Sequence, residues 1–373
     1  MLFIPHKHFY ISGTSYVSAD EPDYKEVITD ANSRRRMGRL LKMAVWCGLK
    51  SLDGVPSERV AGIITSTGAG FMKDTISFGS SIFDREETLL NPSPFMQSTF
   101  NTASGYIALI RKIHAYNTTY VQRADGFSAS LVDAAMLLDD AGEGNVALVG
   151  AFDEVTPEVD VIRQRLGLYR VGDGFLPLGE GAAAFLLSAA MPTDVSVSCP
   201  ATEMSAGLGG GDGSESASKH GGDEAGSESD SERGGDANSE CSTGPLRESE
   251  SASGRDGDEA GSESSSEPLY ESGGTSYISL NGTKDGNADL RFCGFANLSD
   301  LPKCAENPIA ELFGINAGVN VIGCADHVES LGAFRSLLPV LLCKLISEQQ
   351  IPDGYTAIVD DVNEDGVIVL LHK

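Results

Sequence analysis

The sequence predicts an α/β protein with two layered parts, and two observations indicate it. Apolar runs rich in β-branched residues alternate with segments that have the apolar spacing of helices, a pattern typical of helices packed on sheets. The stretch from about Ser205 to Gly274 is almost entirely Gly, Ser, Asp and Glu. It cannot bury enough apolar surface to offset its chain entropy, so we expect disorder there. The expected organisation is residues 1–200, an acidic linker at 201–274, and residues 275–373.

Alternating strands and helices are expected in the first part. Its strands are short apolar runs, and its first helix is amphipathic. The run VAGIITS leads directly into a glycine turn, as a buried strand does. In chain order the elements are strand Phe9–Thr14, helix Arg34–Lys50, strand Val60–Ser66, helix Thr99–His114, strand Thr119–Gln122, helix Ser128–Asp139, and strands Asn145–Gly150 and Ala183–Ser188.

The second part repeats this alternation on a smaller scale. Short strands are expected at Tyr277–Leu280 and Asn320–Gly323, and a long apolar helix at Glu329–Ser347. The chain then closes with strands Thr356–Val362 and Gly366–Leu371. The polar residues 363–365 between them are typical of a hairpin connection.

Charge and composition exclude several classes of function. The formal net charge is −27, and residues 201–274 hold 18 Asp and Glu against 4 Lys and Arg. Neither this linker nor the rest of the chain offers the basic surface that nucleic acids attract. A near-duplication, DEAGSESDSE and DEAGSESSSE, favours a solvated spacer over a binding segment. We expect no membrane span and no signal peptide, and therefore a cytoplasmic protein.

The cysteines and glycine turns do not indicate a cofactor. Seven cysteines are scattered without a CxxC pair, so we expect neither a zinc site nor a disulfide scaffold. Cys47 and Cys343 lie in apolar helical patterns and are expected to be buried free thiols. The turn Thr67–Gly70 follows a strand as a phosphate loop does, but it lacks the lysine of that motif. We expect no metal, nucleotide or other cofactor.

The stretch GDGFLPLGEGAAAFLL at Gly172–Leu187 is the most informative motif. Its glycines and alanines allow close packing of a strand against a neighbouring layer. It resembles the DGF-x-x-G-E/D-G-A-G segment of β-ketoacyl synthases, the condensing enzymes of fatty acid and polyketide synthesis. Four more stretches resemble that family in the same order: RRRMGRLLKMA at Arg34–Ala44, IITSTGAGFMKDTISF at Ile63–Phe78, NPSPFMQSTFNTASGYIAL at Asn91–Leu109 and GAFRS at Gly332–Ser336.

The resemblance implies a thiolase-like fold of two α/β halves, with the acidic insertion between them. It also implies a cysteine nucleophile at a strand-to-helix elbow, which holds the acyl chain, and two histidines that stabilise an enolate. Counting along the matched motifs places Ala124 at the cysteine, Asn281 at the first histidine and Asp326 at the second. No cysteine lies between Cys47 and Cys199. The family's glycine-rich gating turn is replaced by residues 363–366, so none of the catalytic positions is intact.

Two residues are weak substitutes for the missing groups. Ser128 could act as a nucleophile, although a serine at a helix start is more often an N-cap. His327 comes one residue after Asp326. It is either the second histidine of the family shifted by one position, or a surface residue at a helix start. Asn281 can still donate a hydrogen bond, but it suits a local turn equally well.

Three functions remain open at this stage. The first is a noncatalytic subunit of the chain-length-factor type, which pairs with an active ketosynthase in polyene, polyketide or fatty acid synthesis. The compact first half resembles the ketosynthase-like proteins of bacterial aryl-polyene clusters. The second is an atypical condensing enzyme or acyltransferase that uses Ser128 or His327. The third is a non-enzymatic acyl-binding scaffold, for which a homodimer is one form. The resemblance also implies an acyl carrier protein as a partner, for which Arg34–Arg36 are candidate contacts beside their role as a solvated face.

Overall fold

The computed structural model describes residues 1–18, 20–122, 125–168, 170–171, 173–175, 179–190, 277–278, 289–327, 338–361 and 366–373. Its contacts divide the chain into two units, residues 1–198 with 271–373, and residues 199–270. The second unit holds most of the predicted acidic linker and lies outside the described residues. The description below concerns the first unit. Within its described part, no helix is long and apolar enough to cross a bilayer.

One end of the main sheet is formed by strands from the first part of the chain. They are β2 (Phe9–Val17), β3 (Val60–Thr67), β4 (Tyr116–Val121), β5 (Val146–Asp153) and β8 (Gly181–Ser188). Their order is β2-β8-β5-β3-β4. Strand β3 is parallel to β4 and β5, whereas β8 is antiparallel to β5 and β2.

Strands from the end of the chain continue the sheet. They are β10 (Arg291–Asn297), β11 (Val319–Gly323), β12 (Tyr355–Val359) and β13 (Val367–His372), with the short strands β1 (Leu2–Phe3) on β10 and β9 (Tyr277–Ile278) on β2. Their order is β11-β12-β13-β10. The first residues of β10 pair with Phe9 and Tyr10 of β2, which joins the two stretches. The predicted final strand pair is confirmed, since β12 and β13 are antiparallel neighbours.

The two stretches of sheet repeat one strand pattern. In the first, the parallel pair β3 and β5 is followed by antiparallel β8 and β2. In the second, the parallel pair β11 and β12 is followed by antiparallel β13 and β10. The same sequence of strand directions in both stretches indicates two halves built on one plan.

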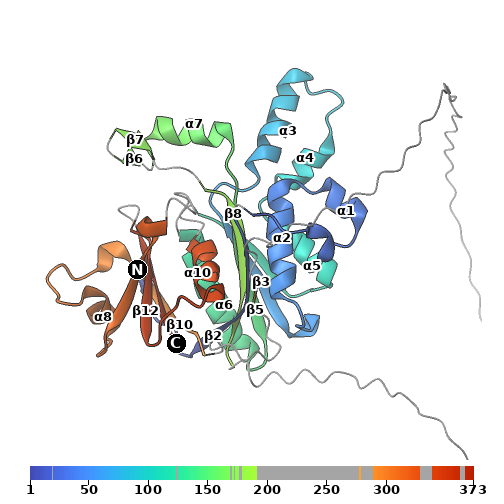
Figure 1. The fold of residues 1–373 in the computed structure, drawn as a ribbon. Helices are drawn as coiled ribbons and strands as arrows, with labels where there is room; N and C mark the ends of the chain where they lie inside the picture. The colour runs from blue at the N-terminus through green and yellow to red at the C-terminus, as the bar shows by residue number, and fades with distance from the viewer. Residues whose placement is uncertain are drawn as a thin grey trace, which may run out of the picture. The chain divides into compact units, whose positions relative to one another are not determined.

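Helices cover both faces of these stretches. They are α1 (Ala31–Arg36), α2 (Arg39–Ser51), α3 (Met72–Asp84), α4 (Pro92–Gln97), α5 (Thr102–Arg111), α6 (Asp125–Ala141), α7 (Pro157–Leu166), α8 (Pro308–Phe313) and α10 (Leu338–Ser347). Figure 1 shows α6 and α10 between the two stretches of sheet, α2 and α5 outside the first, and α8 outside the second. Three apolar clusters fill the spaces between these layers. The predicted layered α/β fold is confirmed.

The strands β5 and β8 are buried along their whole length. Each has helices on both faces, and continuous apolar runs such as VALVGAF are typical of strands in that position. Helix α7 is followed by a separate two-stranded sheet, β6 (Arg170–Val171) with β7 (Gly174–Phe175). In Figure 1 these three elements project from the layers.

The helix predicted at Arg34–Lys50 is instead two helices, α1 and α2. Met37 has an extended backbone with ψ 133°, and Gly38 is the N-cap of α2. The periodicity of the apolar residues is compatible with a single helix. The break is set by a contact from a distant segment, since the backbone N–H of Gly38 donates to Oε1 of Gln97 at 3.0 Å.

Candidate functional site

The small residues of the Gly172–Leu187 motif form β8 and allow close packing. A Cβ atom on Gly150 of β5 would lie 3.0 Å from the carbonyl oxygen of Ala183 and 3.6 Å from Cβ of Ala184. On β8, the carbonyl of Ala184 accepts a hydrogen bond from Oγ of Ser51 in α2 at 2.8 Å. Larger side chains here would push the layers apart. The role of this end of the motif is therefore to let β8 pack closely against its neighbours.

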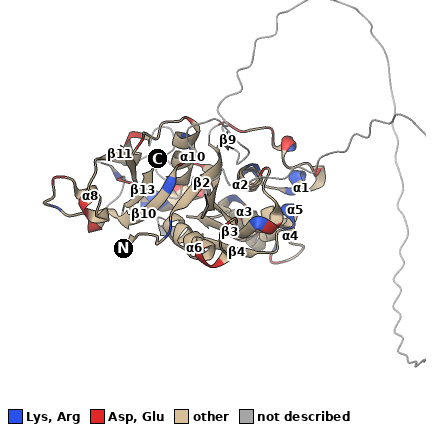
Figure 2. Cartoon of the chain, turned by 90° about the horizontal axis from the view of Figure 1, so that it is seen from below, with Lys and Arg blue, Asp and Glu red and all other residues tan. Residues whose placement is uncertain are grey.

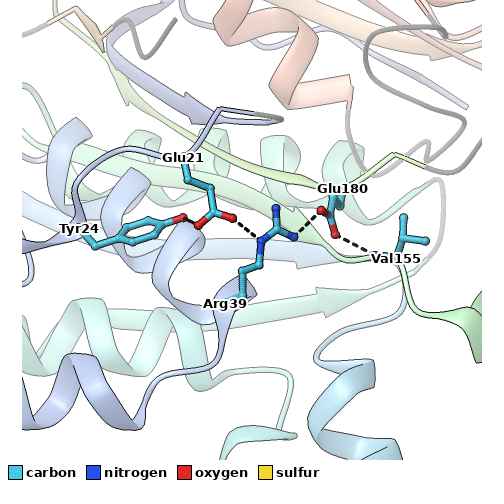
Figure 3. A network of polar contacts seen from close by, with 5 residues as sticks. All are labelled: Glu21, Tyr24, Arg39, Val155 and Glu180. Carbon is cyan, nitrogen blue, oxygen red and sulfur yellow. Dashed lines mark hydrogen bonds and ion pairs between the residues drawn. The ribbon is translucent and has the colours of Figure 1, made fainter. Parts of the chain in front are cut away.

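The glutamate of the same motif binds the arginine of another. Figure 3 shows Arg39, at the start of α2, between the carboxylates of Glu21 and Glu180. Tyr24 donates its hydroxyl hydrogen to Oε2 of Glu21 at 2.8 Å. The other oxygen of Glu180 accepts weakly, at 3.5 Å, from the backbone N–H of Val155. The Arg34–Ala44 and Gly172–Leu187 motifs, far apart in the sequence, therefore meet through one ion pair.

This network fixes the charge of its members. Burial disfavours the charged form of Glu21, but hydrogen bonds from Tyr24 and Arg39 outweigh it and lower the pKa of Glu21. Burial likewise opposes the charge on Arg39, and the two glutamates outweigh it and raise the pKa of the guanidinium. Burial and the hydrogen bond to Glu21 raise the pKa of Tyr24. All three groups therefore keep their ordinary charges at neutral pH.

The Asn91–Leu109 motif reaches the same region through Gln97, at the end of α4. Its amide oxygen accepts from the backbone N–H of Gly38 at 3.0 Å, and its amide nitrogen donates to the carbonyl of Arg36. The Gln97 side chain is buried. It satisfies backbone groups that the break between α1 and α2 leaves without a helical partner.

The glycine turn after β3 is filled by a carboxylate of the chain itself. Asp153, at the end of β5, is fully buried. Its Oδ1 accepts from the hydroxyl of Thr67 at 2.9 Å and from the backbone N–H of Ala69 at 2.9 Å, and its Oδ2 accepts from Gly68 N–H at 2.9 Å. These are the donors that a phosphate loop would offer to a ligand. The turn is thus a structural joint between β3 and β5.

The predicted nucleophile elbow lies between β4 and α6. Ala124, placed at the nucleophile position, lies outside the described residues. The first turn of α6 sits close to β3, because a Cβ atom on Gly126 would lie 3.3 Å from Cβ of Ser66. Phe127 makes an edge-to-face contact with Phe185 of β8, with ring centroids 6.0 Å apart. The elbow and the Gly172–Leu187 motif therefore share one buried contact.

Ser128 is the fourth residue of α6 and does not cap it, because the helix begins at Asp125. The interpretation of Ser128 as an N-cap is therefore wrong. Its side chain is buried, and among the described residues its Oγ has no hydrogen-bond partner. A serine nucleophile needs a bonded base to take its proton. None is bonded to Ser128 here.

Two of the candidates from the second half, Asp326 and His327, lie after β11. Asn281 is outside the described residues. Asp326 and His327 belong to the short helix η5 (Cys324–His327), where Asp326 is exposed and His327 is half-buried. Asp361, after the parallel neighbour β12, accepts from the N–H of Ala325 at 2.9 Å. Because two acidic residues lie at this edge, the surroundings of η5 do not favour an anionic enolate.

The thiols that the structure describes are poor nucleophiles where they are buried. Burial raises the pKa of Cys47, Cys343 and Cys324, and it raises the pKa of Cys293 to about 11. A thiol reacts through its thiolate, which these environments disfavour. The predicted burial of Cys47 and Cys343 is confirmed. Among the described residues, no three His, Cys, Asp or Glu side chains are grouped to hold a metal ion.

Comparison with known proteins agrees with this architecture. Residues 15–171 match the sequence profile of the β-ketoacyl synthase N-terminal domain. The fold is similar to "The ishigamide ketosynthase/chain length factor", with a TM-score of 0.55 and 13% identity, over 98% of this chain and 98% of that one. No curated protein matches the chain.

Two further solved structures are similar. One is a type II polyketide synthase acyl carrier protein in complex with its ketosynthase bound to the hexaketide (AntDE:AntF), with a TM-score of 0.55 and 13% identity over 98% of this chain and 99% of that one. The other is the ketosynthase ApeO in complex with its chain length factor ApeC from Xenorhabdus doucetiae. Its TM-score is 0.37 at 16% identity, over 48% of this chain and 79% of that one.

Together these findings show the fold of the chain. The repeated strand pattern and the central helices α6 and α10 are those of the thiolase-like ketosynthase fold. Residues 15–171 are similar to the β-ketoacyl synthase N-terminal domain. The predicted resemblance is confirmed at this level.

Several residues that hold the motifs together were not anticipated. Asp153, Glu154 and Gln97 are buried polar residues whose partners lie about 60 to 90 positions away. The one signal in the sequence was a pair of acidic residues directly after the apolar run that begins at Val146 and ends at Phe152. A buried acidic residue at a strand end requires nearby donors, which the glycine turn after the neighbouring strand supplies.

Proposed function

We propose that this chain is a noncatalytic ketosynthase-like subunit of the chain-length-factor type, which pairs with an active β-ketoacyl synthase. The observation that carries the proposal is the contrast between scaffold and chemistry. The contacts between motifs are formed, through Arg39 with Glu180, Gln97 with Gly38, and Asp153 with its turn. The residue aligned with the nucleophile is Ala124, and no cysteine lies between Cys47 and Cys199.

The edge strand β4 supports the pairing. Among the described residues β4 pairs with β3 alone, so its outer N–H and C=O groups face away from the sheet. Such an edge is a template for a strand of another chain. Apolar side chains are exposed on β4 and on the adjoining helices α5 and α6, namely Val121, Leu109, Ile110 and Met136. We infer that a second ketosynthase-like subunit covers this face.

The alternative function is an enzyme that uses Ser128 as its nucleophile. The surroundings of Ser128 do not favour it. Its Oγ is buried and has no bonded base among the described residues. If a transfer activity is detected, Ser128→Ala separates the two functions. An unchanged rate in that variant excludes a serine mechanism, and a rate lost entirely supports one.

Co-expression with a ketosynthase encoded beside this chain tests the pairing. We expect a one-to-one heterodimer on size-exclusion chromatography. Val121→Lys places a charge on the β4 face and is expected to reduce recovery of the heterodimer at least ten-fold. Val161→Lys, on the exposed face of α7, is the matched control and should leave recovery unchanged. An acyl carrier protein is the further partner to include, and the exposed arginines of α1 are its candidate contacts (Figure 2).

Two outcomes would contradict this proposal. If the chain forms only a homodimer and no ketosynthase is recovered, the acyl-binding scaffold is favoured instead. If Val121→Lys and Val161→Lys pair equally well, the partner does not dock on β4.

A further inference from the structure

Helix α3 is held on the molecule with little apolar burial. None of its residues from Met72 to Asp84 is buried, and its N-cap residue Phe71 supplies no side-chain hydrogen bond. The first backbone N–H groups of a helix have no partner within the helix and need one from elsewhere. The attachment of α3 therefore depends on contacts at its start, where the buried Phe71 stacks on Phe152 with ring centroids 5.1 Å apart and polar groups meet the first turn.

Glu154 supplies such a contact from the end of β5. Its side chain is buried, and Oε1 accepts from the backbone N–H of Lys73 at 2.9 Å. This is the bond that an N-cap side chain normally makes, here provided by a residue 81 positions away. Asp153, the preceding residue, holds the turn that leads into the helix. The two adjacent carboxyl groups thus fix the start of α3.

Most of the charges that face Glu154 are negative. Lys73 and Asp74 come from the first turn of α3, and Glu180 lies ahead of β8 with Arg39 as its own partner. Burial is the main cause that raises the pKa of Glu154. The hydrogen bond from Lys73 opposes the rise, and Asp74 and Glu180 add to it. Burial also raises the pKa of Asp74.

We propose that Glu154 is a pH-sensitive anchor, which holds α3 on the sheet more firmly when its carboxyl group is protonated than when it is charged. The protonated group still accepts the Lys73 N–H through its carbonyl oxygen. The charged group makes a stronger bond to this N–H, but burial beside Asp74 and Glu180 outweighs that gain. The anchor sets how the α3–α4 hairpin, which exposes Phe83, Leu89, Phe95 and Met96, is presented to solvent.

The direction of the effect follows from linkage. A carboxyl group whose pKa is raised on folding binds its proton more tightly in the folded state than in the unfolded one. The stability that protonated Glu154 contributes is fully present below its ordinary pKa of 4.5. It is lost as the pH rises through the raised pKa of the folded state. Protection of α3 should therefore increase as the pH falls.

Amide hydrogen exchange of the whole chain tests this anchor. Protection of residues 72–84 is followed between pH 5 and pH 8, with correction for the intrinsic exchange rate. In the unaltered chain we expect protection to fall with rising pH. Glu154→Gln keeps a neutral acceptor and should give high protection at every pH. Glu154→Ala removes the acceptor and should give about five-fold lower protection than Glu154→Gln at every pH.

The controls lie in the same molecule. Protection of α2 and β5 reports global stability, so a variant that merely unfolds the chain lowers all three together. Asp74→Asn removes a facing charge and should shift the transition to lower pH. Protection of α3 that is independent of pH in the unaltered chain would overturn the proposal. Equal loss of protection in Glu154→Gln and Glu154→Ala would overturn it as well.

Discussion

Arg39 ties together segments that lie 141 residues apart in the sequence. Both of its carboxylate partners are more than a quarter exposed, so solvent screens each pair and each contributes about 0.2–1 kcal/mol. The planar guanidinium presents its donors in a fixed fork toward both glutamates, whereas a lysine in the same place offers a single ammonium group. The network therefore positions the Gly172–Leu187 motif more than it stabilises the fold.

A variant series measures that contribution. Arg39→Ala should lower the free energy of unfolding by about 1 kcal/mol, and Arg39→Lys should lose roughly half of that. Urea denaturation gives both values. Arg35→Ala, in the exposed turn of α1, is the matched control and should fall within about 0.5 kcal/mol of the unaltered chain. Equal stability of Arg39→Ala and Arg35→Ala would show that the network contributes nothing.

Asp153 is expected to contribute more to the free energy of unfolding than Arg39, because it is fully buried and accepts from three donors. Asp153→Asn replaces one acceptor oxygen with an amide that faces backbone N–H groups. We expect a loss of about 2–3 kcal/mol of unfolding free energy, since a charged acceptor is removed and a buried donor loses its partner. Thermal unfolding checks the value. Asp53→Asn, on an exposed turn, should leave the melting temperature unchanged.

At the scale of elements, β10 shows what a pattern in the sequence does not reveal. No strand was expected at Arg291–Asn297. Its register shifts between Phe292 and Gly294, so the alternation of buried and exposed residues is interrupted. Gly294 has φ +144°, and a Cβ atom there would lie 2.3 Å from the carbonyl oxygen of Phe3. The bulge brings β1 close to β10.

Two glycine substitutions separate a required glycine from a replaceable one. Gly294→Ala is expected to lose at least 2 kcal/mol of unfolding free energy, because the backbone conformation and the approach of β1 both exclude a side chain. Gly79→Ala lies within α3, where a Cβ atom would meet nothing within 4 Å. It should gain up to about 1 kcal/mol, from the higher helix propensity of alanine. Denaturant titration of the pair checks both signs. A neutral Gly294→Ala would contradict the account of the bulge.

The predictions from sequence succeeded where local pattern decides structure. Strands such as β3, β5 and β8 were predicted because they are continuous apolar runs, and the order of elements followed from their alternation with helices. Predictions failed where a distant side chain decides. Gln97 sets the break between α1 and α2, which was not predicted, and the glycine turn was predicted without its partner Asp153. Ser128 lies inside its helix because α6 begins three residues earlier than expected.

At the scale of the whole molecule, the proposed loss of chemistry is compatible with an intact fold. The contacts that hold the layers run through β8, α2 and the glycine turn, and none of these contacts involves the described candidate Asp326. A fold can keep its packed layers when the residues of its site change. The candidate catalytic positions Ala124 and Asn281 came from the resemblance, and they stay predictions.

Intact-protein mass spectrometry tests the central claim most directly. The purified chain is incubated with acetyl, hexanoyl and octanoyl thioesters of acyl carrier protein, beside an active ketosynthase as a positive control. We expect the ketosynthase to gain the mass of each acyl group and this chain to keep its own mass. A stoichiometric acyl adduct on this chain, assigned to one residue by peptide mapping, would contradict a noncatalytic subunit.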